Sequence, residues 1–202
     1  MNIKAIFFDF GGVIQRTEYQ SPRQHLAEKF SMDYDDIDKL VFGGGPNGTS
    51  AKAGIGEIKV EEHWKAIAKR LKIPEGEITK FESEFFAGDV IDHELVTFIR
   101  ALRPKYKTGL ISNAWSDMRE YLVKKKLDDA FDSLTISAEV KLAKPDEKIY
   151  HLALQQAGVK ANESVFVDDI PVNIEACQKI GMHGILFRDA HEVMNEIRKL
   201  LK

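Results

Sequence analysis

Four short apolar runs, each closed by a polar or turn residue, constrain the fold of this chain more than any other feature. They occupy residues 3–8, 108–111, 165–167 and 184–187, and a weaker fifth candidate occupies residues 134–136. Strands that are apolar on both sides are expected where helices cover both faces of a parallel sheet. The runs therefore predict the buried strands of such a sheet.

Helical patterns lie between these runs. Residues 145–158 and 171–181 each begin with proline and end with glycine, and apolar residues recur along both at helical spacing. The C-terminal stretch carries one apolar stripe that includes Val193 and Ile197. This alternation over residues 88–202 predicts an α/β fold, in which right-handed crossovers build a Rossmann-like parallel sheet with helices on both faces.

Residues 16–87 follow a different pattern. An apolar stripe over residues 64–71 predicts one helix, and residues 26–30 and 37–42 suggest others, whereas no convincing strand is found. A glycine-rich stretch, residues 43–56, interrupts the helices and is expected to form a mobile loop. The segment therefore predicts a small all-helical insertion.

This contrast predicts a chain of two parts. We expect a catalytic core made of residues 1–15 and 88–202, and a helical cap of residues 16–87 inserted after the first strand. The full length of 202 residues suits one domain of moderate size that carries a smaller insertion. The later strands of the core must then pair with the first strand across the insertion.

Charge and composition argue against several partners. Lysine and arginine number 29 against 32 aspartate and glutamate, which gives a formal net charge of −3. This balance disfavours nucleic acid or an anionic membrane as a main partner, and no apolar stretch is long enough to span a membrane. The single cysteine, Cys177, excludes an intrachain disulfide. Without a signal-peptide pattern we expect a cytoplasmic protein; no pattern sets its oligomeric state.

Polar residues follow three of the apolar runs. Asp9 ends the first run, Ser112 and Asn113 end the second, and Asp168 and Asp169 end the third. In open parallel sheets, ligands bind outside the carboxyl ends of the strands, so these side chains are expected to line one crevice. Each residue alone is also a favoured helix N-cap. Capping is a strained explanation for all of them together, and the group therefore predicts a ligand site.

Four segments in order resemble the motifs of the haloacid dehalogenase superfamily. They read FDFGGV at residues 8–13, ISN at 111–113, AKPD at 143–146 and VDD at 167–169, the last followed by Asn173. The insertion is similar to the small helical cap of that superfamily, and the resemblance covers essentially the whole chain. In detail the pattern looks most like the branch that contains sugar-1-phosphate phosphatases and the phosphatase domain of soluble epoxide hydrolases.

The resemblance implies a phosphatase that acts on a small phosphorylated metabolite, with sugar phosphates among the candidates. Asp9 would be the nucleophile that forms an aspartyl-phosphate intermediate. Lys144 would neutralise both the phosphate and the Asp9 carboxylate. The Ser112 hydroxyl and the Asn113 main-chain N–H would hold a phosphate oxygen. Gly12 would let the chain turn away from the sheet after the nucleophile.

The resemblance also implies Mg²⁺ as the cofactor. Its ligands would be Asp9, the main-chain carbonyl of Gly11 and Asp169, with Asp168 acting through water. Carboxylate and carbonyl oxygens suit this hard cation. Three neighbouring carboxylates repel one another, and a bound divalent ion removes that cost.

One departure from the superfamily pattern concerns the residue that would donate a proton to the leaving group. Family phosphatases carry a second aspartate two residues after the nucleophile, and here that position is Gly11. General acid–base assistance is worth roughly 10²–10⁴ in rate. Its absence puts efficient hydrolysis of ordinary alkyl phosphates in doubt, and Glu18 or His25 at the start of the cap are candidate substitutes.

Two alternative functions stay open on the sequence alone. A 2-haloacid dehalogenase also uses an aspartate nucleophile without the second aspartate, but such enzymes need no metal and replace the acidic pair with small polar residues. The intact Asp168 and Asp169 therefore favour the phosphatase. The other alternative is a non-catalytic binding protein on the same fold, which turnover of an activated aryl phosphate would exclude.

Overall fold

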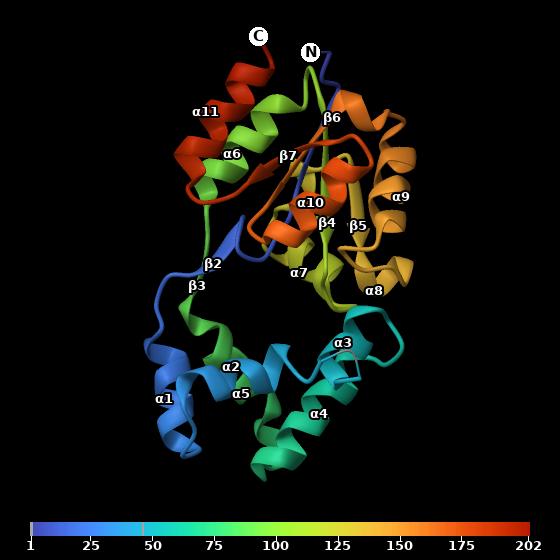
Figure 1. The fold of residues 1–202 in the computed structure, drawn as a ribbon. Helices are drawn as coiled ribbons and strands as arrows, with labels where there is room; N and C mark the ends of the chain where they lie inside the picture. The colour runs from blue at the N-terminus through green and yellow to red at the C-terminus, as the bar shows by residue number, and fades with distance from the viewer. Residues whose placement is uncertain (1, 46) are drawn as a thin grey trace.

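The structure is a computed structural model of the 202-residue chain, and it describes residues 2–45 and 47–202. At its centre lies a five-stranded sheet in the order β5-β4-β1-β6-β7, with every neighbouring pair parallel (Figure 1). All five predicted strands are confirmed, the weaker candidate included. In chain order they are β1 (Ala5–Phe8), β4 (Lys107–Ser112), β5 (Ser133–Ile136), β6 (Ser164–Asp168) and β7 (His183–Leu186).

The strand register aligns the residues that follow the apolar runs. Phe8, the last residue of β1, pairs with Leu110 on one side and with Val167 on the other. The Asp9 N–H continues the ladder by donating to the Val167 carbonyl at 2.9 Å. Asp9, the end of β4 and Asp168 therefore share one edge of the sheet, as expected for carboxyl ends of parallel strands.

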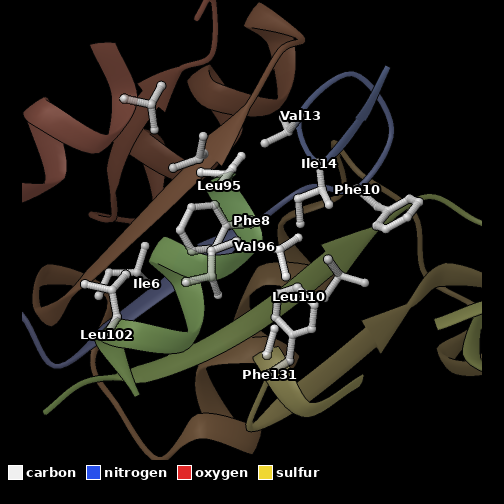
Figure 2. Packing of buried hydrophobic residues seen from close by; sticks show 14 of the residues in the cluster. Ile6, Phe8, Phe10, Val13, Ile14, Leu95, Val96, Leu102, Leu110 and Phe131 are labelled. Carbon is white, nitrogen blue, oxygen red and sulfur yellow. The ribbon is translucent and has the colours of Figure 1, made fainter. Parts of the chain in front are cut away.

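Helices cover both faces of the sheet, which explains its continuous apolar runs. Ile6 and Phe8 of β1 join a cluster with side chains of α6, α7 and α11, whereas Ala5 and Phe7 point to the opposite face and pack with α9 and α10. Figure 2 shows Phe8 between Ile6, Leu95 and Val96 in the first cluster. The core helices are α6 (His93–Leu102), α7 (Met118–Lys124), α8 (Ser137–Val140), α9 (Glu147–Ala157), α10 (Pro171–Lys179) and α11 (Ala190–Leu200).

The cap helices gather at one end of the molecule, opposite the two chain termini (Figure 1). Their buried side chains, among them Leu26, Trp64 and Phe85, form an apolar cluster separate from the two that cover the sheet. The cap helices are α1 (Ser21–Lys29), α2 (Tyr34–Phe42), α3 (Thr49–Gly54), α4 (Val60–Leu71) and α5 (Ile78–Phe85). The exact division at residues 16–87 stays a prediction.

A short antiparallel ribbon joins the cap to the core. It consists of β2 (Gln15–Thr17) and β3 (Asp89–Ile91), so the expectation of no strand from residue 16 onward is wrong at its first two positions. Three half-buried polar residues give no alternation that a sequence pattern can detect. The ribbon is held by Asp89, which accepts hydrogen bonds from Thr17 of β2 at 2.8 Å and from the buried Arg23 of α1 at 2.8 Å.

The glycine-rich stretch 43–56 contains a helix, so the expectation of a continuous loop is wrong over α3; residue 46 of the stretch lies outside the described residues. Glycine lowers helix propensity, but packing against neighbouring elements overrides it. Here Gly56 lies against the core helix α8, since an added Cβ would stand 2.3 Å from the Ala138 carbonyl oxygen. Over the residues described, no helix combines the length and apolar character needed to cross a membrane.

Candidate active site

Asp9 follows β1 directly and is buried, with 6% of its surface exposed. Its Oδ1 atom accepts a hydrogen bond from the Phe10 N–H at 2.7 Å and lies 2.8 Å from Lys144 Nζ. Burial raises the pKa of Asp9 to about 6; the Lys144 cation opposes this rise and the Asp168 carboxylate adds to it. Asp9 is thus a desolvated carboxylate with one oxygen fixed by two donors.

Lys144 lies in the loop before α9 and is the cation of the site. Its side chain is 1% exposed, and Nζ lies 2.8 Å from Asp9 Oδ1 and 2.6 Å from Asp168 Oδ2. A buried ammonium of this kind is stable only with such partners. The structure thus brings together residues that stand 135 and 24 positions from Lys144 in the sequence.

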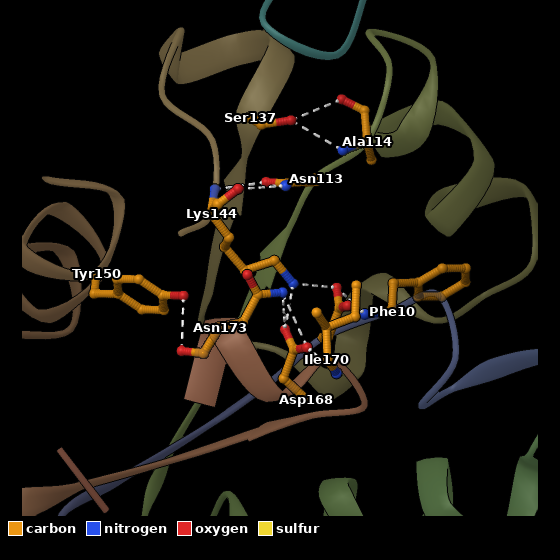
Figure 3. A network of polar contacts seen from close by, with 10 residues as sticks. Phe10, Asn113, Ala114, Ser137, Lys144, Tyr150, Asp168, Ile170 and Asn173 are labelled. Atoms are coloured by element: carbon orange, nitrogen blue, oxygen red, sulfur yellow. Dashed lines mark hydrogen bonds and ion pairs between the residues drawn. The ribbon is translucent and has the colours of Figure 1, made fainter. Parts of the chain in front are cut away.

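Asp168 is fully buried and saturated by protein donors (Figure 3). It accepts hydrogen bonds from the Ile170 N–H at 2.8 Å, from Asn173 Nδ2 at 3.0 and 3.1 Å, and from Lys144 Nζ at 2.6 Å. Asn173 is in turn held by the Tyr150 hydroxyl, which donates to its carbonyl at 3.0 Å. The sequence identifies Asn173 only as part of the last motif, and its contacts in the structure make it a support for Asp168.

Asp169 is the one acidic residue of the site with an unsatisfied buried atom. Its Oδ1 is buried without a hydrogen-bond partner in the described residues, while burial and the neighbouring Asp168 raise its pKa. Oxygen atoms of Asp9, Asp168 and Asp169 lie within 4.8 Å of one another. An orphaned carboxylate oxygen beside two others is chemistry that suits a hard cation. The donor set therefore fits Mg²⁺.

The two glycines after Phe10 differ in what they allow. Gly12 has φ +78°, and an added Cβ would stand 2.2 Å from Asp169 Oδ2, so only glycine lets the acidic pair approach this turn. Gly11 is exposed and outside the left-handed region, and no atom lies within 4 Å of an added Cβ. Position 11 can therefore accept a side chain.

Ser112, the last residue of β4, and Asn113, which follows the strand, lie in different environments. Ser112 is 3% exposed at the last position of the strand. The Asn113 side chain makes two hydrogen bonds to the main chain of Lys144: Nδ2 donates to the Lys144 carbonyl at 2.9 Å, and the Lys144 N–H donates to Oδ1 at 2.8 Å. The family resemblance implies a role for the Asn113 main chain, whereas this side-chain pairing has no signal in the sequence.

The two candidate substitutes for the missing acid lie elsewhere. The half-exposed Glu18 is ion-paired with Arg16 at 3.3 Å, in a depression that also includes Asp92 and Phe187. His25 is exposed on α1. Neither makes a hydrogen bond or an ion pair with the Asp9 cluster in the described part of the chain, so their proposed role gains no support.

An aromatic contact joins the loop after β4 to the helices of the inserted segment. Trp115, three residues after Ser112, stacks on Phe42 at a centroid distance of 5.9 Å and lies 4.9 Å from His63 and 5.5 Å from Trp64. Its Nε1 donates to the Ser50 carbonyl at 3.3 Å. Burial lowers the pKa of His63, so this ring is uncharged at neutral pH. Sequence analysis missed Trp115 because its partners all belong to the inserted segment.

The fold and the site define a class of protein. The family model for haloacid dehalogenase-like hydrolases matches residues 3–181, and the chain belongs to that family. Its parallel α/β core is the one that the sequence predicted.

Individual relatives and a solved structure show which proteins this chain is similar to. The chain is 26% identical over 217 residues to bifunctional epoxide hydrolase 2 of Sus scrofa, covering 99% of this chain but only 39% of that protein. It is 27% identical over 192 residues to D-ribitol-5-phosphate phosphatase of Bacteroides thetaiotaomicron, covering 89% of each. Among solved structures, a HAD family enzyme of Bacteroides thetaiotaomicron in complex with magnesium and inorganic phosphate superposes with TM-score 0.77 at 21% identity over 92% of this chain and 94% of that one. This last likeness establishes the shared fold.

Proposed function

We propose that this hydrolase is a magnesium-dependent phosphatase of small phosphorylated metabolites that works through an aspartyl-phosphate on Asp9. The observation that carries the proposal is the buried cluster of Asp9, Lys144 and Asp168, with the unpaired Asp169 oxygen beside it. The phosphatase relative and the structural neighbour crystallised with magnesium and phosphate support it. Residues 16–87 would act as the cap over this site.

The proposed reaction has two steps. Asp9 attacks phosphorus with the carboxylate oxygen that Lys144 does not hold, the new O–P bond forms, and the bond from phosphorus to the leaving oxygen breaks. Water then attacks the phosphoryl group, which releases inorganic phosphate and the free carboxylate. A pKa of about 6 leaves Asp9 mostly ionised at neutral pH, as a nucleophile requires.

Charge balance explains why the site needs a cation. Three carboxylates and one ammonium sum to −2 before a phosphate dianion arrives, and a dianion would be repelled from such a site. Asp9, Asp169 and the Gly11 carbonyl would hold Mg²⁺, with Asp168 acting through water because its own oxygens are already engaged. When bound, the metal neutralises charge on the phosphoryl oxygens.

The remaining polar groups would set phosphate orientation and leaving-group preference. The Ser112 hydroxyl and the Asn113 N–H would donate to a phosphate oxygen at the end of β4. With Gly11 in place of an acid, the departing oxygen gains no proton from that position. Sugar 1-phosphates and aryl phosphates, whose leaving groups are comparatively acidic, are therefore the proposed substrate class.

A single set of assays tests the proposal against its alternatives. We expect turnover of p-nitrophenyl phosphate with Mg²⁺ that EDTA abolishes and added Mg²⁺ restores, and then a preference for sugar 1-phosphates within a metabolite panel. Chloride release from 2-chloropropionate in the presence of EDTA would instead establish the dehalogenase. No turnover of either substrate would favour a binding protein.

A further inference from the structure

A chain of hydrogen bonds links the cap to the catalytic lysine. It begins at Gly54, the last residue of α3. The Gly54 carbonyl accepts a hydrogen bond from the Ser137 hydroxyl of α8. The same hydroxyl accepts from the Ala114 N–H at 2.9 Å. Asn113, the residue before Ala114, pairs through its side chain with the main chain of Lys144. Figure 3 shows the Ser137–Ala114 and Asn113–Lys144 contacts, one above the other.

The Asn113 side chain holds the main chain of Lys144 through two hydrogen bonds. Both polar atoms of the amide are engaged, one as donor to the Lys144 carbonyl and one as acceptor from its N–H, at 2.9 and 2.8 Å. This arrangement copies the pairing between strands, so it holds the lysine main chain at a set distance from the end of β4. The Lys144 side chain is 1% exposed and carries its ammonium to Asp9 and Asp168, so a shift of its Cα shifts Nζ.

The Ser137 link adds the cap to this arrangement. Ser137 is fully buried at the start of α8, and its hydroxyl accepts a hydrogen bond from the Ala114 N–H of the core. Two carbonyls compete for its single proton, that of Gly54 in the cap at 2.5 Å and that of Ala114 at 3.2 Å, and the shorter distance assigns the proton to Gly54. The contact is close on both sides, because Gly56 leaves no room for a Cβ against the Ala138 carbonyl. Gly54 and Gly56 therefore dock onto α8 at the point where the core loop 113–114 is held.

We propose that Asn113 and Ser137 are positioning residues for Lys144, and that docking of the cap through the Gly54 carbonyl stabilises the productive position of the lysine. The proposal rests on the proposed phosphatase function for its kinetic consequences, and on the hydrogen-bond chain alone for its structural ones.

Kinetics with a matched control give the first test. Misplacement of a catalytic group by about 1 Å costs roughly 10²-fold, so Asn113→Ala is expected to lower kcat/KM for p-nitrophenyl phosphate by about that factor. Ser137→Ala, which loses the bridge but keeps Asn113, is expected to lose about fivefold. The control is Ser164→Ala: Ser164 is also fully buried and donates to the Ala161 carbonyl at 2.7 Å, but at the far end of β6. It should leave kcat/KM unchanged.

Combination with Lys144→Ala separates positioning from general destabilisation. If Asn113 acts through Lys144, then Asn113→Ala has no further effect on kcat/KM once the lysine side chain is gone. The same holds for Ser137→Ala. Full losses retained in the Lys144→Ala background would overturn the proposal.

Acetylation of Lys144 gives a readout that needs no activity. Wild-type Lys144 is buried and should react slowly with acetic anhydride, with the exposed Lys148 as internal reference. Asn113→Ala and Ser137→Ala are expected to speed acetylation of Lys144 by at least about fivefold relative to wild type, the factor that one hydrogen bond is worth, and Ser164→Ala should not. Unchanged protection in both variants refutes the positioning role. Faster acetylation in a protein without phosphatase turnover would retain the role and reject the proposed function instead.

Discussion

The sheet edge of the core and the aromatic cluster of the cap are built by different means. At the sheet edge, the Asp168 carboxylate accepts hydrogen bonds from three different donor residues, and the Lys144 ammonium has two carboxylate partners. In the cap, two ring nitrogens of the described residues, His63 Nε2 and Trp64 Nε1, are buried without a hydrogen-bond partner. Hydrogen bonds therefore determine atomic positions in the core, whereas the shapes of apolar rings determine packing in the cap.

The difference indicates how the two regions should respond to change. A network such as that of Asp9, Lys144 and Asp168, in which charged groups hold one another, loses function when one atom is replaced. A cluster held by ring packing tolerates replacement by a ring of similar size. The variants below test this contrast, from the largest expected effect to the smallest.

Asp9→Asn should abolish turnover. The amide is nearly the same shape as the carboxylate but is a poor nucleophile, so we expect kcat to fall by at least about 10⁴-fold. Stopped assays with p-nitrophenyl phosphate measure the loss, and circular dichroism checks that the fold is intact. Wild-type kcat in a folded variant would show that Asp9 is not the nucleophile.

Gly11→Asp should change how rate depends on the leaving group. In the wild type we expect rates to fall steeply as leaving-group pKa rises across a series of aryl and alkyl phosphates. The new carboxyl has room at position 11 and should raise alkyl phosphate turnover by about 10²-fold, which flattens the slope. A flat wild-type slope, measured where chemistry limits the rate, would mean that another residue donates the proton.

Variants of Asp168 and Asp169 should differ in how much Mg²⁺ affinity and how much unfolding free energy they lose. Asp168→Ala, at the indirect ligand, should weaken Mg²⁺ affinity by about 10- to 100-fold, and Asp169→Ala, which removes the unpaired oxygen of a direct ligand, should weaken it more. In contrast, Asp168→Ala strips Lys144 and Asn173 of a buried partner and should cost about 3–5 kcal/mol of unfolding free energy. Calorimetric titration and urea unfolding measure the two effects. Equal Mg²⁺ binding by all three proteins would remove the metal site from the proposal.

The raised pKa of Asp9 predicts a pH-dependent stability difference in metal-free protein. Because the folded-state pKa, about 6, lies above the ordinary aspartate value of 3.8, the folded state binds the extra proton between these values. The contribution of Asp9 to wild-type stability should therefore fall as pH rises from 4 to 7. Asp9→Asn lacks this dependence. In EDTA, the Tm of the variant minus the Tm of the wild type should therefore increase as pH rises. A Tm difference that is constant with pH would contradict the raised pKa.

Trp64→Phe should have the smallest effect. The indole N–H of Trp64 has no partner to lose, and the ring packs edge-on against Phe81, Phe86 and Trp115. We expect kcat/KM within about twofold of wild type and a loss of unfolding free energy below about 1.5 kcal/mol. A loss as large as that of Asp168→Ala would remove the contrast between cap and core.

The parts of this molecule that sequence could predict are those encoded locally. Apolar runs identify the strands of the sheet, and polar residues that end them identify Asp9 and Asp168. The ribbon at Gln15 depends on partners far away, including the Tyr121 hydroxyl that donates to its side-chain oxygen. The Asn113 pairing with Lys144 likewise joins residues 31 positions apart. Such contacts follow from the fold and leave no pattern in the chain nearby.

The ribbon of β2 and β3 has a consequence for protein engineering. Thr17 pairs with Asp89, and the Glu18 N–H donates to the Gly88 carbonyl at 3.0 Å, so the insertion leaves the core and returns to it at adjacent points. The free energy of closing a loop rises only slowly with its length. The ribbon is thus a site at which the insertion can be exchanged. A shorter turn or a foreign helical module grafted there should leave the register of the five-stranded sheet unchanged.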